Sequence, residues 1–277
     1  MTTEATDPAF VDLDAWPLER ILDAVVERSR HAVDAVTQAR AALERAATGI
    51  EVRLANGGRL VYVGAGTSGR IALQDAAELP PTFGFERTVV LMAGGGRAGE
   101  RAVENAEDDA DAAERDVADA EVTSRDSVIA ISASGRTPYT LAGVRAARAR
   151  GAFTVGIANN PGAPLLGAAE VGVLLDTGPE VLAGSTRLAA GTAQKTALNA
   201  LSTAVLVRAG GAYHNLMVGM RATNDKLRKR AVQMVADAAG SSLPAAEAAL
   251  RSADWAVREA IVMLVADVDV DAARALL

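Results

Sequence analysis

The sequence predicts an α/β protein in which helices cover both faces of a parallel sheet, giving three layers. Five short apolar runs rich in β-branched residues recur between residues 59 and 175, and the stretches that separate them have helical spacing. Strands and helices that alternate in this way form parallel sheets, because each crossover helix packs on one face of the sheet. We expect helices before this sheet and a small helical domain after it.

The segment before the sheet carries apolar residues at helical spacing. They are Leu18, Ile21, Leu22, Val25, Val26, Val33, Val36 and Leu43. This spacing predicts one or two amphipathic helices between residues 17 and 48. A second subunit could cover their apolar face, so we expect a homodimer.

The five apolar runs predict the strands of the sheet. We place them at residues 59–63, 88–92, 127–132, 153–157 and 171–175. We assign them to a central domain at residues 55–240, after an N-terminal helical segment at residues 1–54. In open parallel sheets, ligands bind beyond the carboxyl ends of the strands. Two hydroxyl-rich loops lie there, after the first and third strands.

The first of these loops combines glycines with hydroxyl side chains. Gly64, Gly66 and Gly69 allow the backbone to approach an anion closely, and Thr67 and Ser68 supply hydroxyl groups. A helix that begins near Gly69 would point its amides at the same place. The loop therefore predicts a phosphate site. The same glycine spacing fits a dinucleotide fingerprint, but the next strand ends in Ala and Gly residues, without the carboxylate that would bind a ribose.

The second loop, residues 132–137, repeats this chemistry after the third strand. Ser132, Ser134 and Thr137 surround Gly135, and their hydroxyl groups could converge on one anion at the start of the next helix. Serine and threonine also cap helices routinely, so one such loop could be purely structural. Two such loops at the same edge of a sheet favour a sugar-phosphate pocket.

The chain after the fifth strand reads as helical. We expect long helices at about residues 187–208 and 216–239, and three short ones at about residues 244–251, 254–265 and 270–276. Residues 241–277 resemble a small three-helix, ubiquitin-associated-like domain. Packing or dimer contact is the expected role of that domain.

Composition excludes several classes of function. The 277 residues carry a net charge of −7, which disfavours nucleic acid as a partner. There is no cysteine, and the two histidines are His31 and His214, so disulfides, thiolate catalysis and a histidine metal site are excluded. The first residues look like neither a signal peptide nor a membrane span. We therefore expect a soluble, cytoplasmic protein with no membrane partner.

Three glutamates are candidates for chemistry. We expect Glu78 at the end of a helix that Pro80 and Pro81 terminate, with its carboxylate near the rim of the first loop. Glu107 lies in an acidic run that would ordinarily be a solvated surface, and its spacing cannot place it beside Glu78. Glu180 is the third candidate. A surface role is the alternative for Glu78 and Glu107.

Longer strings around these residues resemble one enzyme family. The matching strings are residues 64–70, 78–84, 106–109, 132–139, 178–188, 190–195 and 215–218. They are similar to N-acetylmuramic acid 6-phosphate etherases, within the wider sugar-isomerase-type (SIS) superfamily of phosphosugar-binding proteins. The resemblance is dense over about residues 55–240 and implies a flavodoxin-like SIS domain.

The resemblance implies a homodimeric enzyme of cell-wall amino-sugar recycling that needs no metal or organic cofactor. Such an enzyme removes the D-lactyl ether of N-acetylmuramic acid 6-phosphate by elimination and water addition, giving N-acetylglucosamine 6-phosphate and D-lactate. The family's pattern makes Glu78 the acid that protonates the departing lactate oxygen and Glu107 the base at C2. Both loops would bind substrate, together with Glu180 and Ser185.

Two other functions fit the same loops. The first is a phosphosugar isomerase, which would use Glu180 as its base, or another lyase that acts on a related phosphosugar. The second is a non-catalytic sensor like the glucokinase regulatory protein, which would need only the loops. The retained pair of Glu78 and Glu107 favours the etherase. The chain departs from the family pattern at Ala189, where a lysine is common, at Gly219, where an aspartate is common, and at Ala158, where a cysteine is common.

Overall fold

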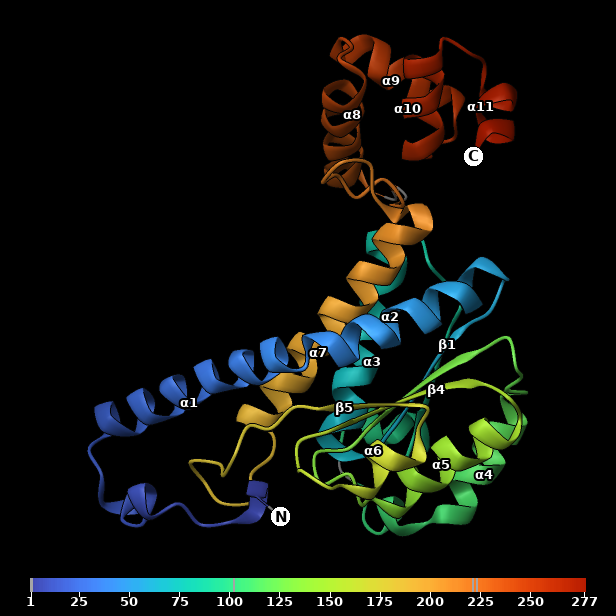
Figure 1. Ribbon diagram of the computed structural model, residues 1–277. Coiled ribbons are helices and arrows are strands. Elements are labelled where there is room, and N and C mark those ends of the chain that lie inside the picture. Colours follow the sequence, from blue (N-terminus) through green and yellow to red (C-terminus); the bar gives the residue numbers. More distant parts are fainter. Residues whose placement is uncertain (1, 102, 221, 223) are drawn as a thin grey trace. The chain divides into compact units, whose positions relative to one another are not determined.

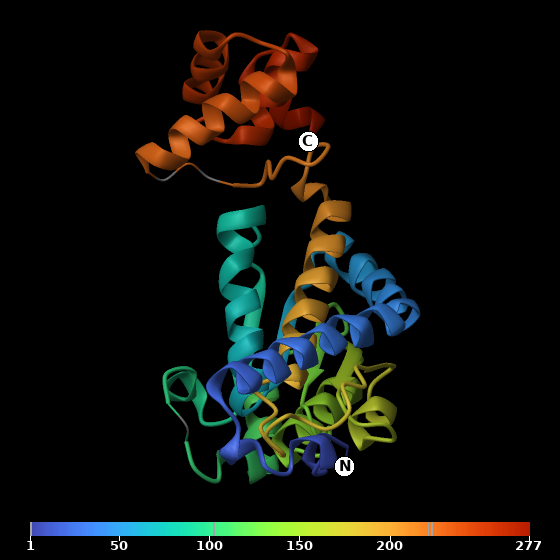
Figure 2. The same ribbon diagram turned by 90° about the vertical axis from the view of Figure 1, so that its left-hand side faces the viewer.

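The computed structural model describes residues 2–101, 103–220, 222 and 224–277, which form two compact units (Figures 1 and 2). The first unit takes the described residues up to Ala76 together with Arg87–Val205, and it contains the sheet. The second unit takes Ala77–Glu86 and the described residues of Leu206–Leu277. The division into residues 1–54, 55–240 and 241–277 stays a prediction.

The sheet of the first unit is parallel, and its five strands run in the order β2-β1-β3-β4-β5. The strands are β1 (Leu60–Gly64), β2 (Thr88–Met92), β3 (Ser127–Ile131), β4 (Phe153–Ala158) and β5 (Val171–Leu174). Each lies within one residue of its predicted bounds. The predicted α/β class is confirmed.

Helices cover both faces of this sheet, as Figure 1 shows. One face is covered by α4 (Ala110–Asp119), α5 (Pro138–Ala149) and α6 (Pro164–Ala168), which contact the strands and one another. The other face is covered by α2 (Arg40–Ala55) and by two helices that run side by side in Figure 2, α3 (Gly66–Phe83) and α7 (Ala189–Leu206).

The alternation of side chains along the strands divides the core between these two faces. Val61, Val63 and Val128 pack with the residues of α4 and α5. Leu60, Tyr62 and Ile129, at the intervening positions, face α2 and α7, where Ile50 and Leu198 lie among their neighbours. Every residue of the three central strands, β1, β3 and β4, is buried, whereas most residues of the edge strands β2 and β5 are half-buried. Full burial is expected for parallel strands covered on both faces.

A buried polar network joins β1, α3 and α7 on the second face. The Tyr62 hydroxyl donates to Asp75 Oδ2 at 2.8 Å, and the Ser202 hydroxyl donates to Asp75 Oδ1 at 3.1 Å. Burial raises the pKa of the Asp75 carboxyl, although these two hydrogen bonds oppose the rise. Both carboxylate oxygens are satisfied, so the network fixes how α3 and α7 sit on the sheet.

The chain before the sheet begins with three short 3-10 turns, η1 (Thr2–Glu4), η2 (Pro8–Phe10) and η3 (Leu13–Ala15), and continues into α1 (Leu18–Gln38). The predicted amphipathic helices are therefore α1 and α2. Leu18, Leu22, Val26 and Val33 are exposed along α1. Within the described residues, no helix combines the length and apolar character needed to cross a membrane.

The expectation that Pro80 and Pro81 terminate the helix after the first loop is wrong. The helix α3 continues through both prolines to Phe83, and Gly84 N donates to Pro80 O at 2.9 Å beyond them. Proline removes a backbone donor, but its fixed φ is compatible with a helix. Glu78 therefore lies inside α3 and is exposed there.

The second unit is built around four helices. They are α8 (Asp225–Ala239), α9 (Leu243–Ser252), α10 (Val257–Ala266) and α11 (Val270–Leu276). Val235, Leu250 and Ile261 are at the centre of their shared core. The helix expected from residue 216 begins only at Asp225, because Asn224 caps it by accepting a hydrogen bond from Leu227 N.

Close backbone contact joins the two parts of the second unit. A Cβ at Gly219 would lie 2.2 Å from Phe83 O, and one at Gly84, where φ is +64°, would lie 2.4 Å from Gly219 O. Neither position has room for a side chain. The departure from the family's common aspartate at Gly219 thus coincides with a tight contact to the end of α3.

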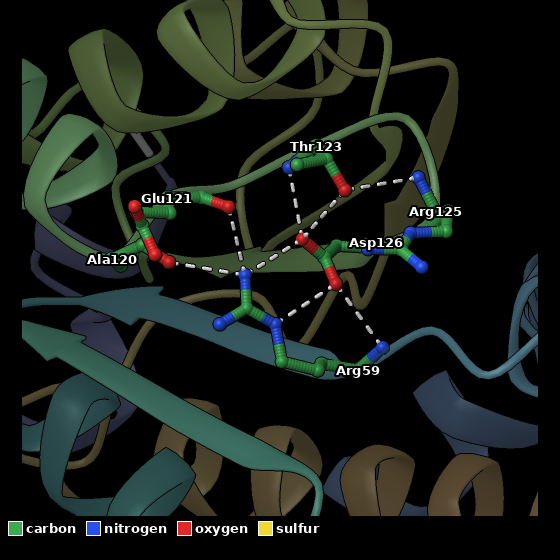
Figure 3. Close-up of polar contacts among 6 residues, drawn as sticks. All are labelled: Arg59, Ala120, Glu121, Thr123, Arg125 and Asp126. Carbon is green, nitrogen blue, oxygen red and sulfur yellow. Dashed lines mark hydrogen bonds and ion pairs between the residues drawn. The ribbon is translucent and has the colours of Figure 1, made fainter.

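An ion pair between Arg59 and Asp126 closes the amino-terminal edge of the sheet (Figure 3). Arg59 Nη2 lies 2.8 Å from Asp126 Oδ2 and Arg59 Nε lies 3.0 Å from Oδ1, a two-point contact. Arg59 Nη2 also donates to the carbonyls of Ala120 and Glu121, and Thr123 N donates to Asp126. Burial would raise the pKa of Asp126, but these donors outweigh it and hold that pKa below its ordinary value.

We predict that Asp126→Asn lowers the free energy of unfolding by about 2–3 kcal/mol at neutral pH, because it removes charged hydrogen bonds from a buried site. The pKa of Asp126 is lower in the folded chain than its ordinary 3.8, so its contribution is complete above pH 3.8 and is lost as the pH falls below it. Urea unfolding followed by circular dichroism from pH 7 to pH 3 measures this. The exposed Asp119→Asn is the matched control, and an equal loss in both variants would refute the role of the ion pair.

Candidate functional site

The two predicted anion loops lie next to each other at the carboxyl edge of the sheet. They follow β1 and β3, which are neighbours in the sheet, and Gly64 at the end of β1 is the register partner of Ile131 at the end of β3. The strand order reverses between these two strands, since β2 lies beyond β1 and β4 beyond β3. Open α/β sheets bind ligands at such a switch point.

The first loop is tightly packed on the end of β1. A Cβ at Gly69 would lie 3.2 Å from Gly64 O, and one at Gly64 would lie 3.1 Å from the Gly69 Cα. Gly66, the first residue of α3, has φ of +54°. These two features explain why glycines are needed here. Ser68 is buried and Thr67 is half-buried, so both predicted hydroxyls stand at the beginning of α3.

The three hydroxyl groups of the second loop form one connected cluster. Ser132 Oγ lies 3.2 Å from Ser134 Oγ and 2.9 Å from Thr137 Oγ1, and it accepts from Gly135 N at 3.0 Å. Ser132 is buried and organises the loop, whereas Ser134 and Thr137 are half-buried. The side chain of Thr137 precedes α5 without capping it, and the first residue of α5 is Pro138, which has no amide hydrogen.

Glu180 caps the start of α7. It is 1% exposed, and its two carboxylate oxygens accept from Ala189 N at 3.0 Å and Ala190 N at 2.9 Å, at the start of α7. A carboxylate at a helix N-terminus is favoured by the helix dipole. Ser185 lies half-buried in the turn between Glu180 and α7. Contact of Glu180 and Ser185 with substrate stays a prediction.

The departure from the family pattern at Ala189 falls at this cap. Ala189 is the first residue of α7 and is 1% exposed, and its N–H is one of the two donors to Glu180. The N–H of residue 189 therefore donates to Glu180 regardless of which side chain this position carries. Close by, a Cβ at Gly191 would lie 3.6 Å from the Thr67 Cγ2, so the start of α7 lies against the first loop.

Glu107 lies in a short turn that packs against α5. It lies in η5 (Ala106–Asp108), which contacts α5, the helix that begins after Thr137. The buried Tyr139 in the first turn of α5 donates to Asp116 of α4, which fixes these two helices to each other. Glu107 itself is exposed. Glu78 belongs to the second unit, and its pairing with Glu107 stays a prediction.

Sequence reasoning missed two asparagines that follow β4 directly. Asn159 and Asn160 are both buried. Asn159 Nδ2 donates to Leu175 O at 3.0 Å, and Asn159 Oδ1 accepts from Gln194 Nε2 of α7 at 2.8 Å. Asn160 contacts the second loop. Their position at the carboxyl end of a predicted strand was a signal that could have marked them.

Comparison with protein families identifies the domain. The chain matches the glucokinase regulatory protein N-terminal SIS domain over residues 28–148 and the SIS domain over residues 104–204. An N-acetylmuramic acid 6-phosphate etherase of Deinococcus radiodurans is 53% identical over 95% of this chain and 87% of its own length. The chain belongs to the N-acetylmuramic acid 6-phosphate etherase family.

Further relatives agree with this assignment. An etherase of the same name from Streptomyces coelicolor is 45% identical over 100% of this chain and 90% of its own length. Among solved structures, a phosphoheptose isomerase from Neisseria gonorrhoeae superposes with a TM-score of 0.51 at 21% identity, covering 68% of this chain and 97% of its own. An Escherichia coli protein in complex with A5P gives a TM-score of 0.53 at 19% identity over 72% and 97%. These structures support the fold.

We predict that Ser134→Ala weakens the binding of inorganic phosphate about 3- to 10-fold and lowers the free energy of unfolding by less than about 1 kcal/mol. It removes a half-buried hydroxyl that accepts from Arg136 N and lies 3.2 Å from Ser132 Oγ. Ser132→Ala should weaken binding and also lower the free energy of unfolding by about 1–2 kcal/mol, because Ser132 holds the loop together. Calorimetry and urea unfolding measure the two effects. The exposed Ser124→Ala is the control, and unchanged phosphate binding by both loop variants would remove the anion role.

Proposed function

We propose that this protein cleaves the D-lactyl ether of N-acetylmuramic acid 6-phosphate, giving N-acetylglucosamine 6-phosphate and D-lactate. The observation that carries the proposal is the 53% identity to a named etherase over 95% of the chain. The two hydroxyl loops at the switch point of the sheet support it, because they suit a small phosphorylated ligand. A net charge of −7 is compatible with such a local anion site.

The reaction proceeds by elimination and water addition. Glu107 removes the proton at C2 of the ring-opened sugar, and Glu78 protonates the departing lactate oxygen, after which water adds to the unsaturated intermediate. Amides and hydroxyls of the loops stabilise the negative charge that develops during elimination. Both glutamates are exposed in the single chain. Bound substrate and a second subunit would bury them and separate their protonation states.

The position of Glu180 weighs against the isomerase alternative. A base on C2 needs a carboxylate oxygen that is free to accept a proton from substrate. Both oxygens of Glu180 instead accept hydrogen bonds from the first two amides of α7. The sensor alternative has no use for Glu78 and Glu107, and both residues are present.

We also propose that the protein is a homodimer. The exposed apolar side chains of α1 support this, since Leu18, Leu22 and Val26 are 72%, 57% and 58% exposed and follow one another at intervals of four residues. Such spacing places them along one side of a helix, where a second subunit would cover them. The cytoplasmic location expected from the sequence stays a prediction.

We predict that the purified protein releases D-lactate from N-acetylmuramic acid 6-phosphate and that Glu78→Gln reduces kcat by about 100-fold or more, because the amide cannot protonate the leaving oxygen. Glu107→Gln should have an effect of the same order. A coupled assay for D-lactate measures turnover, with the exposed Glu114→Gln as control. Full turnover by Glu78→Gln would refute its role as acid, and no release by the wild type would refute the etherase.

We predict that Leu22→Glu and Val26→Glu together convert the dimer to a monomer, because two charges would have to be buried in the interface. Light scattering at micromolar concentration measures the mass, and the pair Asp23→Asn and Glu27→Gln, on neighbouring positions of α1, is the control. A wild-type protein that is already monomeric would contradict the proposed dimer.

A further inference from the structure

A buried asparagine connects the start of the chain to the second anion loop. Asn160, which is 3% exposed, has all of its hydrogen-bonding capacity in use. Its Oδ1 accepts from Thr2 Oγ1 at 3.0 Å and from Thr3 N at 3.2 Å. Its Nδ2 donates to Thr3 Oγ1 at 2.9 Å and to Ala133 O at 2.8 Å. One side chain thus bridges η1 and the residue between Ser132 and Ser134.

This bridge fixes the orientation of one peptide group in the loop. Ala133 O accepts a second hydrogen bond, from Asn159 N at 3.0 Å, so two donors hold the carbonyl toward the end of β4. In a planar trans peptide, the following N–H points in the opposite direction. The N–H of Ser134 is therefore directed away from the asparagines. Within the described residues, no group accepts a hydrogen bond from it.

The same turn also contacts the loop that leads to α7. Thr3 is 1% exposed, and its carbonyl accepts from Gly184 N at 3.2 Å, next to Ser185. Figure 1 shows the start of the chain beside the segment between β5 and α7. The turn η1 therefore joins two loops that carry predicted ligand residues. The contacts of Thr3 with Asn160 are buried and use both backbone and side-chain groups.

We propose that Thr3 and Asn160 are positioning residues for the phosphate end of the substrate. Thr3 orients Asn160, Asn160 holds the Ala133 carbonyl, and the Ser134 amide is thereby presented to the anion together with the loop hydroxyls. Neither residue contacts the reacting carbons. The inference rests on the proposed function only for the identity of the sugar, since it concerns a phosphate group.

The test compares Thr3→Val with Thr3→Ser. Valine keeps the shape of threonine and its backbone contacts but removes the hydroxyl that accepts from Asn160 Nδ2, whereas serine retains that hydroxyl. Calorimetric dissociation constants are measured for inorganic phosphate, for N-acetylglucosamine 6-phosphate and for unphosphorylated N-acetylglucosamine. Thr6→Val is the matched control, because Thr6 is exposed and lies three residues further along the chain. Thr2→Ala, which removes an exposed donor to Asn160, provides a milder second variant.

We expect Thr3→Val to weaken the binding of inorganic phosphate and of N-acetylglucosamine 6-phosphate about 3- to 10-fold, and Thr2→Ala to weaken it less. Thr3→Ser and Thr6→Val should bind both ligands like the wild type. In the D-lactate assay, Thr3→Val should raise KM and leave kcat unchanged. Equal phosphate affinity in Thr3→Val and wild type would overturn the inference, as would a drop in kcat at constant KM. If the wild type releases lactate and Thr3→Val has the same KM as the wild type, the etherase stays and only the positioning role is removed. The converse, a phosphate effect without lactate release, would remove only the etherase.

Discussion

The site depends on the close approach of α3 to the end of β1. Because Gly64 and Gly69 have no side chains, the first turn of α3 can lie against the last residue of the strand. The parallel register then places Ile131, and with it the second loop, beside Gly64. A side chain at either glycine would push the helix away from the strand and open the anion site.

Much of this architecture follows from local sequence. The strands could be predicted because β-branched runs alternate with helical stretches, and a parallel sheet buried on both faces leaves that signal clear. The two anion loops could be predicted because glycine and hydroxyl residues directly follow two of the strands. Their adjacency could not, because a sequence does not give the order of strands in a sheet.

Other features depend on contacts between segments that are distant in the sequence, and such contacts cannot be predicted from local sequence patterns. Thr3 and Asn160 are separated by 157 residues, and neither belongs to a motif by itself. Glu180 looked like a possible base, but its role as cap depends on where α7 begins. Pro80 and Pro81 indicated a helix end, but both lie inside α3, which continues to Phe83.

The contact between Gly84 and Gly219 limits which residues this chain can accept at these two positions. The peptide that follows Phe83 and the backbone at Gly219 occupy each other's side-chain space. Replacing Gly219 by aspartate would require the Phe83–Gly84 peptide to shift, and that peptide ends the helix on which Glu78 lies. Each of these positions therefore limits the other: a side chain at Gly219 requires the end of α3 to move, and a side chain at Gly84 requires the backbone at Gly219 to move.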